Sequence, residues 1–430
     1  MKIFCSGIGG IGLSAYAGHM IARGHTVHGT DKTPSIITDD IREKGATVSF
    51  VQDGTAVPRD CDLFVYSEAI PESAPERTVA RERGIPQMSY FKAVGELSRG
   101  GKVICIAGTH GKSSTTAMVA KMLIEAGLDP NVVVGTRMKD MGNTNWRASK
   151  SDLWVIEACE YRRSFHFLTP SVILLTNVDG DHFDAYRDID DYRNAFVEFC
   201  RLLPRDGTVI LHGNDNDALS IVTNAEKSHI DADTLPPVHL QVPGVHMRAN
   251  ASLALALALS LGVQEETARQ SLQSFSGTWR RMDIKGRTEE GSLVIDDYGH
   301  HPLEVSATLS AIREAYPGKR IICIFQPHTH DRTVKLLQEF AVSFKDADLL
   351  IVPNIYDARP DKDAKKVSVD EFISVVEKGS GVRVRNGMNL QETEKIIHGV
   401  GLSEEDVVVT MGAGDITALS TTLAVQPYLR

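Results

Sequence analysis

Residues 107–114 carry the side chains best suited to chemistry on a phosphate group. They join an expected strand, Lys102–Ala107, to an expected helix, Lys112–Ala126. Backbone N–H groups in such a turn can surround phosphates, and the start of a helix adds positive potential. Lys112 is expected to reach the terminal phosphates, and the Ser113 hydroxyl is expected to bind Mg²⁺. Ile106 stands where the full Walker pattern has glycine, so this is a shortened GxxGK[S/T] loop.

A second glycine turn, Gly7–Gly12, reads GIGGIG and also lies between an expected strand and an expected helix. Asp31 follows at about the spacing at which an acidic residue ends the second strand of a dinucleotide fold. The pattern favours a pyrophosphate site, and taken alone it would indicate a nicotinamide dehydrogenase.

Acidic and histidine residues follow two later strands. Glu157 comes after Leu153–Ile156, and His182 lies a few residues after Val172–Thr176. We expect these strands to be adjacent and parallel, so that both side chains face the phosphate loop. Mg²⁺ prefers oxygen ligands, which makes the imidazole the less typical one. Structural capping or core packing is the alternative reading of His182.

Two histidine-containing segments lie in the last third of the chain, Asp296–Pro302 and Phe325–His328. Both come directly after expected strands, at the sheet edge where open α/β sheets bind ligands. A third glycine turn, Gly412–Asp415, follows the last expected strand. The alternative reading is that these segments only cap strands and helices.

Apolar runs of strand length alternate with helical periods throughout, which is typical of parallel sheets covered by helices. We predict a three-domain α/β protein. The domains are a Rossmann-like N-terminal domain (1–97), a central P-loop ATPase-type domain (98–283) and a Rossmann-like C-terminal domain (284–430). The polar stretch Glu96–Gly101 is predicted to be a linker.

The composition is that of an ordinary globular protein, with 430 residues, 42% hydrophobic and 24% charged. The formal charge of −10 argues against nucleic acid as a partner. Six scattered cysteines without a CxxC pair suggest reduced thiols and a cytoplasmic location. No apolar run approaches the ~20 residues of a membrane span, so we expect no membrane insertion and no secretory signal.

The order of these motifs resembles the Mur ligases, which add amino acids to the UDP-muramoyl precursor of the bacterial cell wall. The resemblance covers essentially the whole chain, and the YGHHP and FQPH segments are closest to the alanine-adding branch. It implies an ATP-dependent, amide-forming ligase with ATP and Mg²⁺ as cofactors. Its other implied substrates are UDP-N-acetylmuramic acid and L-alanine.

The resemblance also implies roles for individual residues. The implied catalytic residues are Lys112, Glu157, His182 and His328. Metal binding falls to Ser113, Glu157 and His182. ATP binding falls to Gly108, Thr109, His110, Gly111, Lys112, Ser113, Ser114, His246, Asn250, Arg281 and Asp297. UDP-sugar binding falls to Gly7, Gly9, Gly10, Gly12, Asp31 and Ser67. Amino-acid binding falls to Tyr298, His300, His328 and Arg332, and either histidine is a candidate base for the amine.

Three positions depart from the family pattern. Cys159 stands where the alanine-adding branch commonly has aspartate, and Met247 replaces an asparagine. Thr329 stands where an arginine near the substrate carboxylate is expected. An arginine binds a carboxylate through two N–H groups, which a hydroxyl does not match. Looser selection of the amino acid is therefore expected.

Other functions remain open at this stage. A murein-tripeptide recycling ligase shares the first domain and a segment like Glu157–Tyr161, whereas folate polyglutamate ligases lack such a first domain. A nicotinamide oxidoreductase fused to an ATPase and a non-catalytic UDP-sugar sensor belong to different classes. The intact Lys112, Ser113 and Glu157 argue against the sensor.

Overall fold

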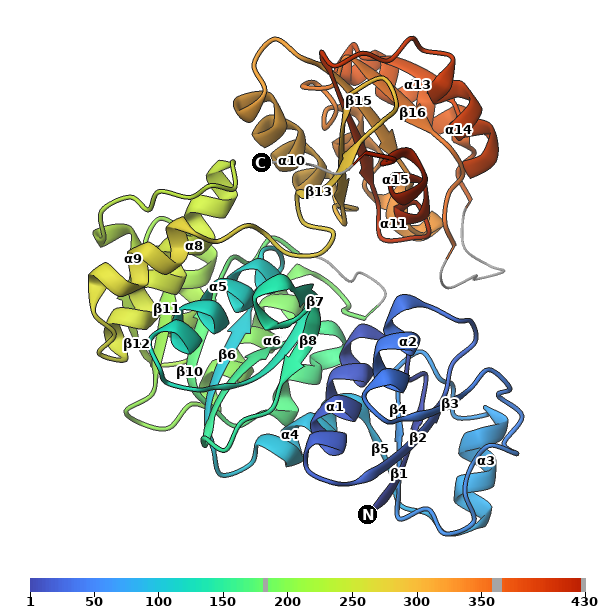
Figure 1. Cartoon of the computed structure of the whole chain (residues 1–430). Coiled ribbons are helices and arrows are strands. Elements are labelled where there is room, and N and C mark those ends of the chain that lie inside the picture. The colour runs from blue at the N-terminus through green and yellow to red at the C-terminus, as the bar shows by residue number, and fades with distance from the viewer. Residues whose placement is uncertain (181–184, 358–365, 427–430) are drawn as a thin grey trace. The chain divides into compact units, whose positions relative to one another are not determined.

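The chain forms three sheets with mainly parallel strands, which follow one another along the sequence (Figure 1). The computed structural model describes residues 1–180, 185–357 and 366–426. It forms two compact units, one of Met1–His239 with Asn250–Phe275 and one of Leu240–Ala249 with Ser276–Arg430. The predicted three-domain α/β architecture is confirmed.

The first sheet has the strand order β3-β2-β1-β4-β5, with all strands parallel. Chain order reverses between β1 and β4, which is where such sheets bind ligands. Its elements are β1 (Lys2–Ser6), α1 (Ile11–Ala22), β2 (Thr26–Thr30), α2 (Ile36–Glu43), β3 (Thr47–Ser49), β4 (Leu63–Tyr66), α3 (Pro75–Glu82), β5 (Gln87–Ser89) and α4 (Tyr90–Ser98).

The second sheet has the order β12-β11-β10-β6-β9-β7-β8, and only the β7–β8 pair is antiparallel. Its strands are β6 (Lys102–Ala107), β7 (Asn131–Met138), β8 (Thr144–Arg147), β9 (Leu153–Glu157), β10 (Pro170–Leu175), β11 (Thr208–Leu211) and β12 (Ser228–Asp231). Its helices are α5 (Lys112–Glu125), η1 (Lys139–Met141), η2 (Tyr161–Phe167), α6 (Ile189–Arg201), α7 (Asn216–Asn224), η3 (Ala232–Thr234), α8 (Val245–Ser260) and α9 (Glu265–Gln273).

The third sheet has the order β13-β14-β18-β15-β16-β17, and β13 is antiparallel to its neighbour. Its strands are β13 (Asp283–Arg287), β14 (Leu293–Asp297), β15 (Arg320–Phe325), β16 (Leu349–Val352), β17 (Arg383–Asn386) and β18 (Asp406–Met411). Its helices are α10 (Pro302–Ala315), α11 (His330–Lys335), α12 (Leu337–Ala341), α13 (Val369–Ser380), α14 (Leu390–His398) and α15 (Thr417–Leu423).

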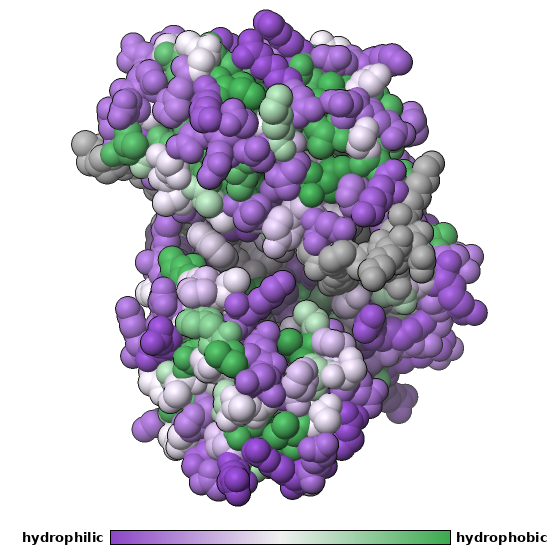
Figure 2. All heavy atoms as spheres, turned by 90° about the vertical axis from the view of Figure 1, so that its right-hand side faces the viewer, coloured by the Kyte–Doolittle hydropathy of each residue, from purple (hydrophilic) through white to green (hydrophobic). Residues whose placement is uncertain are grey.

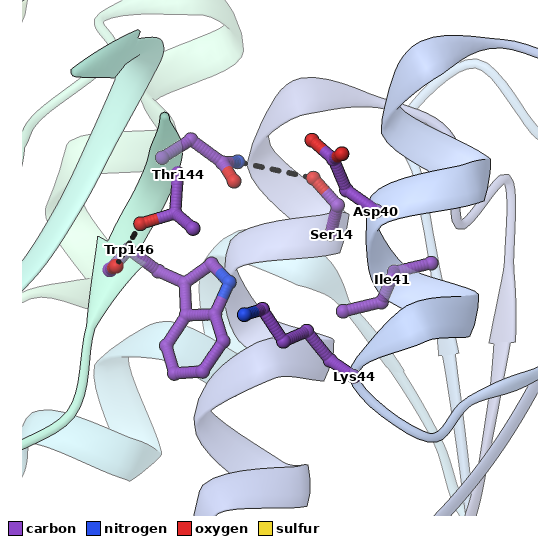
Figure 3. A pocket seen from close by; sticks show the side chains of 7 residues that line it. Ser14, Asp40, Ile41, Lys44, Thr144 and Trp146 are labelled. Atoms are coloured by element: carbon purple, nitrogen blue, oxygen red, sulfur yellow. Dashed lines mark hydrogen bonds between the residues drawn. The ribbon is translucent and has the colours of Figure 1, made fainter. Parts of the chain in front are cut away.

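A hairpin of the second sheet, β7–β8, packs against α1 of the first. A Cβ atom added to Gly18 would lie only 2.1 Å from Trp146 Cε2, so the tryptophan ring fills the space beside this glycine. Asn145 of the hairpin donates a hydrogen bond to Ser14 Oγ of α1 at 3.0 Å. A small pocket of about 10 Å³ remains between the hairpin, α1 and α2 (Figure 3). That volume holds about one water molecule. Buried side chains of both sheets form one continuous core.

One expected boundary was wrong. Residues 96–98 end helix α4 instead of forming a linker, because Ser89 caps the start of this helix and Ser98 donates back to Val94 O. Helix α8 begins at Val245. Gly244, with φ of 109°, turns the chain immediately before it, and Arg248 N already donates to Gly244 O.

Within the described ranges, no helix is long and apolar enough to cross a membrane. On the face shown in Figure 2, hydrophobic residues are scattered among hydrophilic ones.

Candidate active site

The shortened phosphate loop is fixed by two glycines between β6 and α5. Gly108 has φ of 133°, and a Cβ there would lie 2.1 Å from Thr176 Oγ1. Gly111 has φ of 82° and precedes the first residue of α5. The first N–H groups of a helix have no acceptor within the helix, so residues 111–114 present donors suited to an anion.

The other side of the loop is held by the chain itself. Thr109 N donates to Asn177 O and His110 N donates to Asn177 Oδ1, both at 2.9 Å. Thr176 Oγ1 donates to His110 O at 2.6 Å. The backbone donors of Thr109 and His110, both predicted to bind ATP, are therefore used to shape the loop. Only His182 in the segment after β10 had a predicted role, and the structure shows that the first two residues of this segment, Thr176 and Asn177, support the loop.

Lys112 is folded back along the loop. Its Nζ donates to Gly108 O at 2.6 Å, to Thr109 O at 2.9 Å and to Glu160 Oε1 at 3.1 Å. Burial, the largest single influence, would lower the pKa of this ammonium, but the charge and hydrogen bond of Glu160 together with the nearby Cys159 and Glu157 outweigh it, so the pKa is raised. Glu160 had no predicted role, because its contact with Lys112 joins residues 48 positions apart in the chain.

Ser113 and Glu157 form a pair of oxygen ligands beside the loop. Ser113 Oγ donates to Glu157 Oε1 at 3.0 Å, and Gly135 N donates to Glu157 Oε2 at 2.7 Å. A hydroxyl and a carboxylate side by side fit the ligand preference of Mg²⁺. His182, the third predicted ligand, lies outside the described residues.

The expectation that β9 and β10 are adjacent was wrong. Both flank β6, the strand that leads into the phosphate loop. Glu157 at the end of β9 and the residues after β10 therefore approach the loop from opposite sides. Asn250 of α8 also lies against the loop, since a Cβ on Gly111 would stand 2.5 Å from its Oδ1.

The turn after β1 borders a cavity of about 700 Å³ at the point where strand order reverses. Its lining includes five of the six residues predicted to bind the UDP-sugar: Gly7, Gly9, Gly10, Asp31 and Ser67. The sixth, Gly12, packs against α4, because a Cβ there would lie 2.6 Å from Tyr90 Cζ. Gly9 N donates to Asp31 Oδ2 at 2.7 Å.

A buried carboxylate that the sequence analysis missed also lines this cavity. Glu76 is 1% exposed and accepts hydrogen bonds from Thr30 Oγ1 at 2.6 Å and from Ser6 Oγ. Burial raises the pKa of Glu76 despite these two donors. The glutamate lies on α3, 70 residues after Ser6, so no local motif marked it.

The predicted amino-acid residues lie together in the second unit, at the ends of β14 and β15. The ring centroids of Tyr298 and His300 are 5.4 Å apart, and those of His300 and His328 are 5.7 Å apart. Arg332 Nη1 contacts His328 Nδ1 at 3.3 Å. Tyr356, which the sequence analysis did not name, stacks on His328 with centroids 5.8 Å apart.

The remaining predicted ATP residues of this unit line the start of α10. Arg281 lies 5.1 Å from the Tyr298 ring centroid and 3.7 Å from Glu304 Oε1. Asp297 is buried and accepts from Met282 N and Gly299 N at 2.9 and 2.8 Å. Burial lowers the pKa of His246 to about 4, with nearby Arg281 acting in the same direction. Their contact with ATP stays a prediction.

Comparisons with known proteins cover nearly the whole chain. Residues 2–102 match the model of the Mur ligase family catalytic domain. Residues 106–236 match the Mur ligase middle domain, and residues 280–414 match the Mur ligase glutamate ligase domain. The UDP-N-acetylmuramate–L-alanine ligase of Clostridium kluyveri is 36% identical over 96% of both chains. That of Clostridium novyi is also 36% identical, over 96% of this chain and 95% of the relative.

Solved structures agree with these matches. A UDP-N-acetylmuramate-alanine ligase from Thermotoga maritima superposes with a TM-score of 0.82, at 27% identity over 98% of both chains. A murein peptide ligase from Psychrobacter arcticus, at 21% identity and a TM-score of 0.73 over the whole of both chains, shares the fold. The chain belongs to the Mur ligase family.

Proposed function

We propose that this protein is an ATP-dependent ligase that joins L-alanine to the lactyl carboxylate of UDP-N-acetylmuramic acid. The observation that carries the proposal is a pair of glycine turns in one unit, each between a parallel strand and a helix. One borders the 700 Å³ cavity, and the other leads into Lys112 and Ser113, with Glu157 beside Ser113. A nicotinamide dehydrogenase has no use for the second turn. The 36% identity to alanine-adding relatives supports the choice of substrates over a recycled tripeptide.

The phosphate loop serves the first chemical step. The lactyl carboxylate attacks the γ-phosphoryl group of ATP, which gives an acyl phosphate and ADP. Charge spreads over the transferring group, and the Lys112 ammonium and the N–H groups at the start of α5 stabilise it. Ser113 and Glu157 would hold Mg²⁺, which supplies further neutralisation of phosphate charge when bound.

The histidines of the second unit serve the amide-forming step, in which the amine of L-alanine attacks the acyl phosphate and phosphate leaves. The amine must be neutral to attack, so a nearby base helps. His300 Nδ1 faces Tyr298 O at 3.1 Å, which places the proton of a neutral ring on Nδ1 and the lone pair on Nε2. Arg332 donates to His328 Nδ1 and imposes the opposite tautomer. The two rings thus differ in tautomer, and either histidine is a candidate base for the amine.

A phosphate-release assay tests the proposal directly. We expect release only when ATP, Mg²⁺, UDP-N-acetylmuramic acid and L-alanine are all present. The panel should include glycine, L-serine, the murein tripeptide and, in a separate cuvette, NADH. Use of the tripeptide in preference to L-alanine, or oxidation of NADH, would contradict the assignment.

We also propose a cytoplasmic location. All six cysteines are described by the structure and are free thiols, which is typical of a reducing compartment.

A further inference from the structure

Lys112 already uses all the hydrogen-bond donors that an ammonium group has. A lysine ammonium carries three donors, and the three contacts of Lys112 go to Gly108 O, Thr109 O and the Glu160 carboxylate. A phosphate oxygen can be bound only if one of these contacts is given up or shared. The resting position of Lys112 therefore competes with nucleotide binding.

Glu160 is the partner that Lys112 is least able to release. Glu160 is 0% exposed, and its two carboxylate oxygens lie 3.1 and 3.0 Å from Nζ. Without the ammonium, Glu160 would be a buried carboxylate with no compensating charge, which costs much free energy. A backbone carbonyl is neutral, so losing its contact with Lys112 costs less. The lysine is thus expected to keep Glu160 and to exchange a loop carbonyl for phosphate.

The chain holds Glu160 in place with an unusual turn. Arg162 and Arg163, two and three residues after Glu160, have φ of 50° and 57°, in a region that non-glycine residues avoid. Arg163 N donates back to Glu160 O at 2.8 Å, and Tyr186 Oη donates to the same oxygen. The Arg163 side chain is anchored to Asp191 at 2.8 Å. Two neighbouring residues in strained conformations are retained because the surrounding contacts fix this turn.

We propose that Glu160 is a positioning residue that holds the Lys112 ammonium from the side opposite the nucleotide and keeps nucleotide affinity low. Its negative charge lies within hydrogen-bonding distance of the group that must attract phosphate. It therefore weakens the binding of both ATP and the product ADP while fixing where the ammonium points. The two glutamates of one motif thus divide the work, with Glu157 next to Ser113 and Glu160 on Lys112.

The inference rests on the proposed use of ATP, and its test is titration calorimetry with MgADP on the full chain. Glu160→Gln keeps the acceptor oxygen and the shape but removes the charge. We expect MgADP to bind about tenfold more tightly, or more, because the Lys112 ammonium is no longer neutralised by a carboxylate at hydrogen-bonding distance and its charge acts fully on the phosphates. We also expect kcat to fall, because Lys112 is oriented less firmly and ADP leaves more slowly.

Two controls separate positioning from general damage. Glu198→Gln removes a carboxylate that pairs with Arg163 on the same turn and should leave ADP affinity unchanged. In a Lys112→Ala background, Glu160→Gln should give no tightening, because the effect acts through the ammonium. Tightening that persists without Lys112 would overturn the proposal, as would unchanged or weaker ADP binding by a folded Glu160→Gln variant.

A second variant covers the case in which Glu160→Gln does not fold. Glu160→Asp keeps the charge pair but shortens the reach, so ADP affinity should stay near that of the unmodified protein while kcat falls. An unchanged kcat in Glu160→Asp would overturn the positioning role. Absence of any MgADP binding to the unmodified protein would instead contradict the proposed function.

Discussion

Lys112 and the turn at Gly7–Gly12 lie at different sheets of one unit, and we propose that they serve different ligands. Lys112→Ala should reduce turnover by about 100- to 1000-fold, since it removes a charge that acts on the transferring phosphoryl group. Binding of UDP-N-acetylmuramic acid should be nearly intact. Phosphate release and calorimetric titration of the sugar nucleotide measure the two effects. Equal loss of both would mean that the two sites are not independent.

The oxygen pair Ser113 and Glu157 predicts the metal dependence. Ser113→Ala and Glu157→Gln should raise the Mg²⁺ concentration needed for half-maximal activity, because each removes an oxygen ligand. His182→Gln should shift it less. Titrating Mg²⁺ at saturating substrates compares the three variants. A shift confined to His182→Gln would contradict the assignment of the oxygen pair.

Thr329 has a structural role that the sequence did not reveal. It precedes α11 with φ of 64° and ψ of 140°, and its side chain accepts a hydrogen bond from Arg332 N at 3.5 Å. The residue thus caps the short helix that carries Arg332. An arginine in place of Thr329 would add a charged group near the proposed amino-acid site and would remove the cap of α11.

Thr329→Arg should therefore move two measurements in opposite directions. A charge-assisted contact to the L-alanine carboxylate is worth about 1.5–3 kcal/mol, so the KM for L-alanine should fall by roughly 10- to 150-fold. Stability should fall by about 1 kcal/mol through loss of the cap. Thr329→Gln is the matched control, since it loses the cap without adding charge. An unchanged KM for L-alanine in Thr329→Arg would contradict a contact between this position and the substrate carboxylate.

At the scale of elements, local patterns predicted what lies next to a strand end. The turns after β1 and β6, the helix after each and the loops after β14 and β15 were all placed from strand–turn–helix spacing. Contacts between distant segments could not be predicted this way. Glu160 meets Lys112, and Glu76 meets Ser6, through packing of whole elements. The order of β9, β6 and β10 likewise depends on the crossover connections between them, which the sequences of the strands themselves do not reveal.

The contact between α1 and the β7–β8 hairpin predicts how a substitution at Gly18 changes the stability of the protein. Alanine in place of glycine inside a helix usually stabilises it by about 1 kcal/mol. Gly18→Ala should instead destabilise the protein by about 1–3 kcal/mol, because its methyl group would overlap the Trp146 ring. Urea unfolding measures the change. In a Trp146→Ala background the same substitution should be stabilising, and destabilisation there would contradict the steric explanation.

At the scale of the molecule, the first two sheets belong to one folding unit. Their cores are continuous, and Arg137 of β7 pairs with Asp40 of α2. The 700 Å³ cavity beside the Gly7–Gly12 turn and the loop between β6 and α5 consequently belong to a single compact unit. His19 lies at the centre of this junction, fully buried between Trp146 and Trp154, with ring centroids 5.7 and 5.1 Å away.

The hydrogen bonds of His19 require a neutral ring. Nε2 faces Val132 O at 3.0 Å and donates to it, while Nδ1 accepts from Arg23 Nη1 at 3.3 Å. Burial lowers the pKa of His19 to about 4, and the neighbouring Arg23 charge acts in the same direction. In the unfolded chain the pKa of histidine is about 6.5.

His19 should therefore make the first unit less stable as the pH falls from about 6.5 to about 4. Above this window both states are neutral and His19 adds no pH dependence. Within it the unfolded chain binds a proton that the folded chain excludes, so the free energy of unfolding falls by up to about 3 kcal/mol. Urea unfolding followed by fluorescence of Trp146 and Trp154 at several pH values measures it. His19→Phe should flatten this slope, whereas His246→Gln in the other unit should leave it unchanged. A slope that is identical with and without His19 would show that the junction does not depend on a neutral histidine.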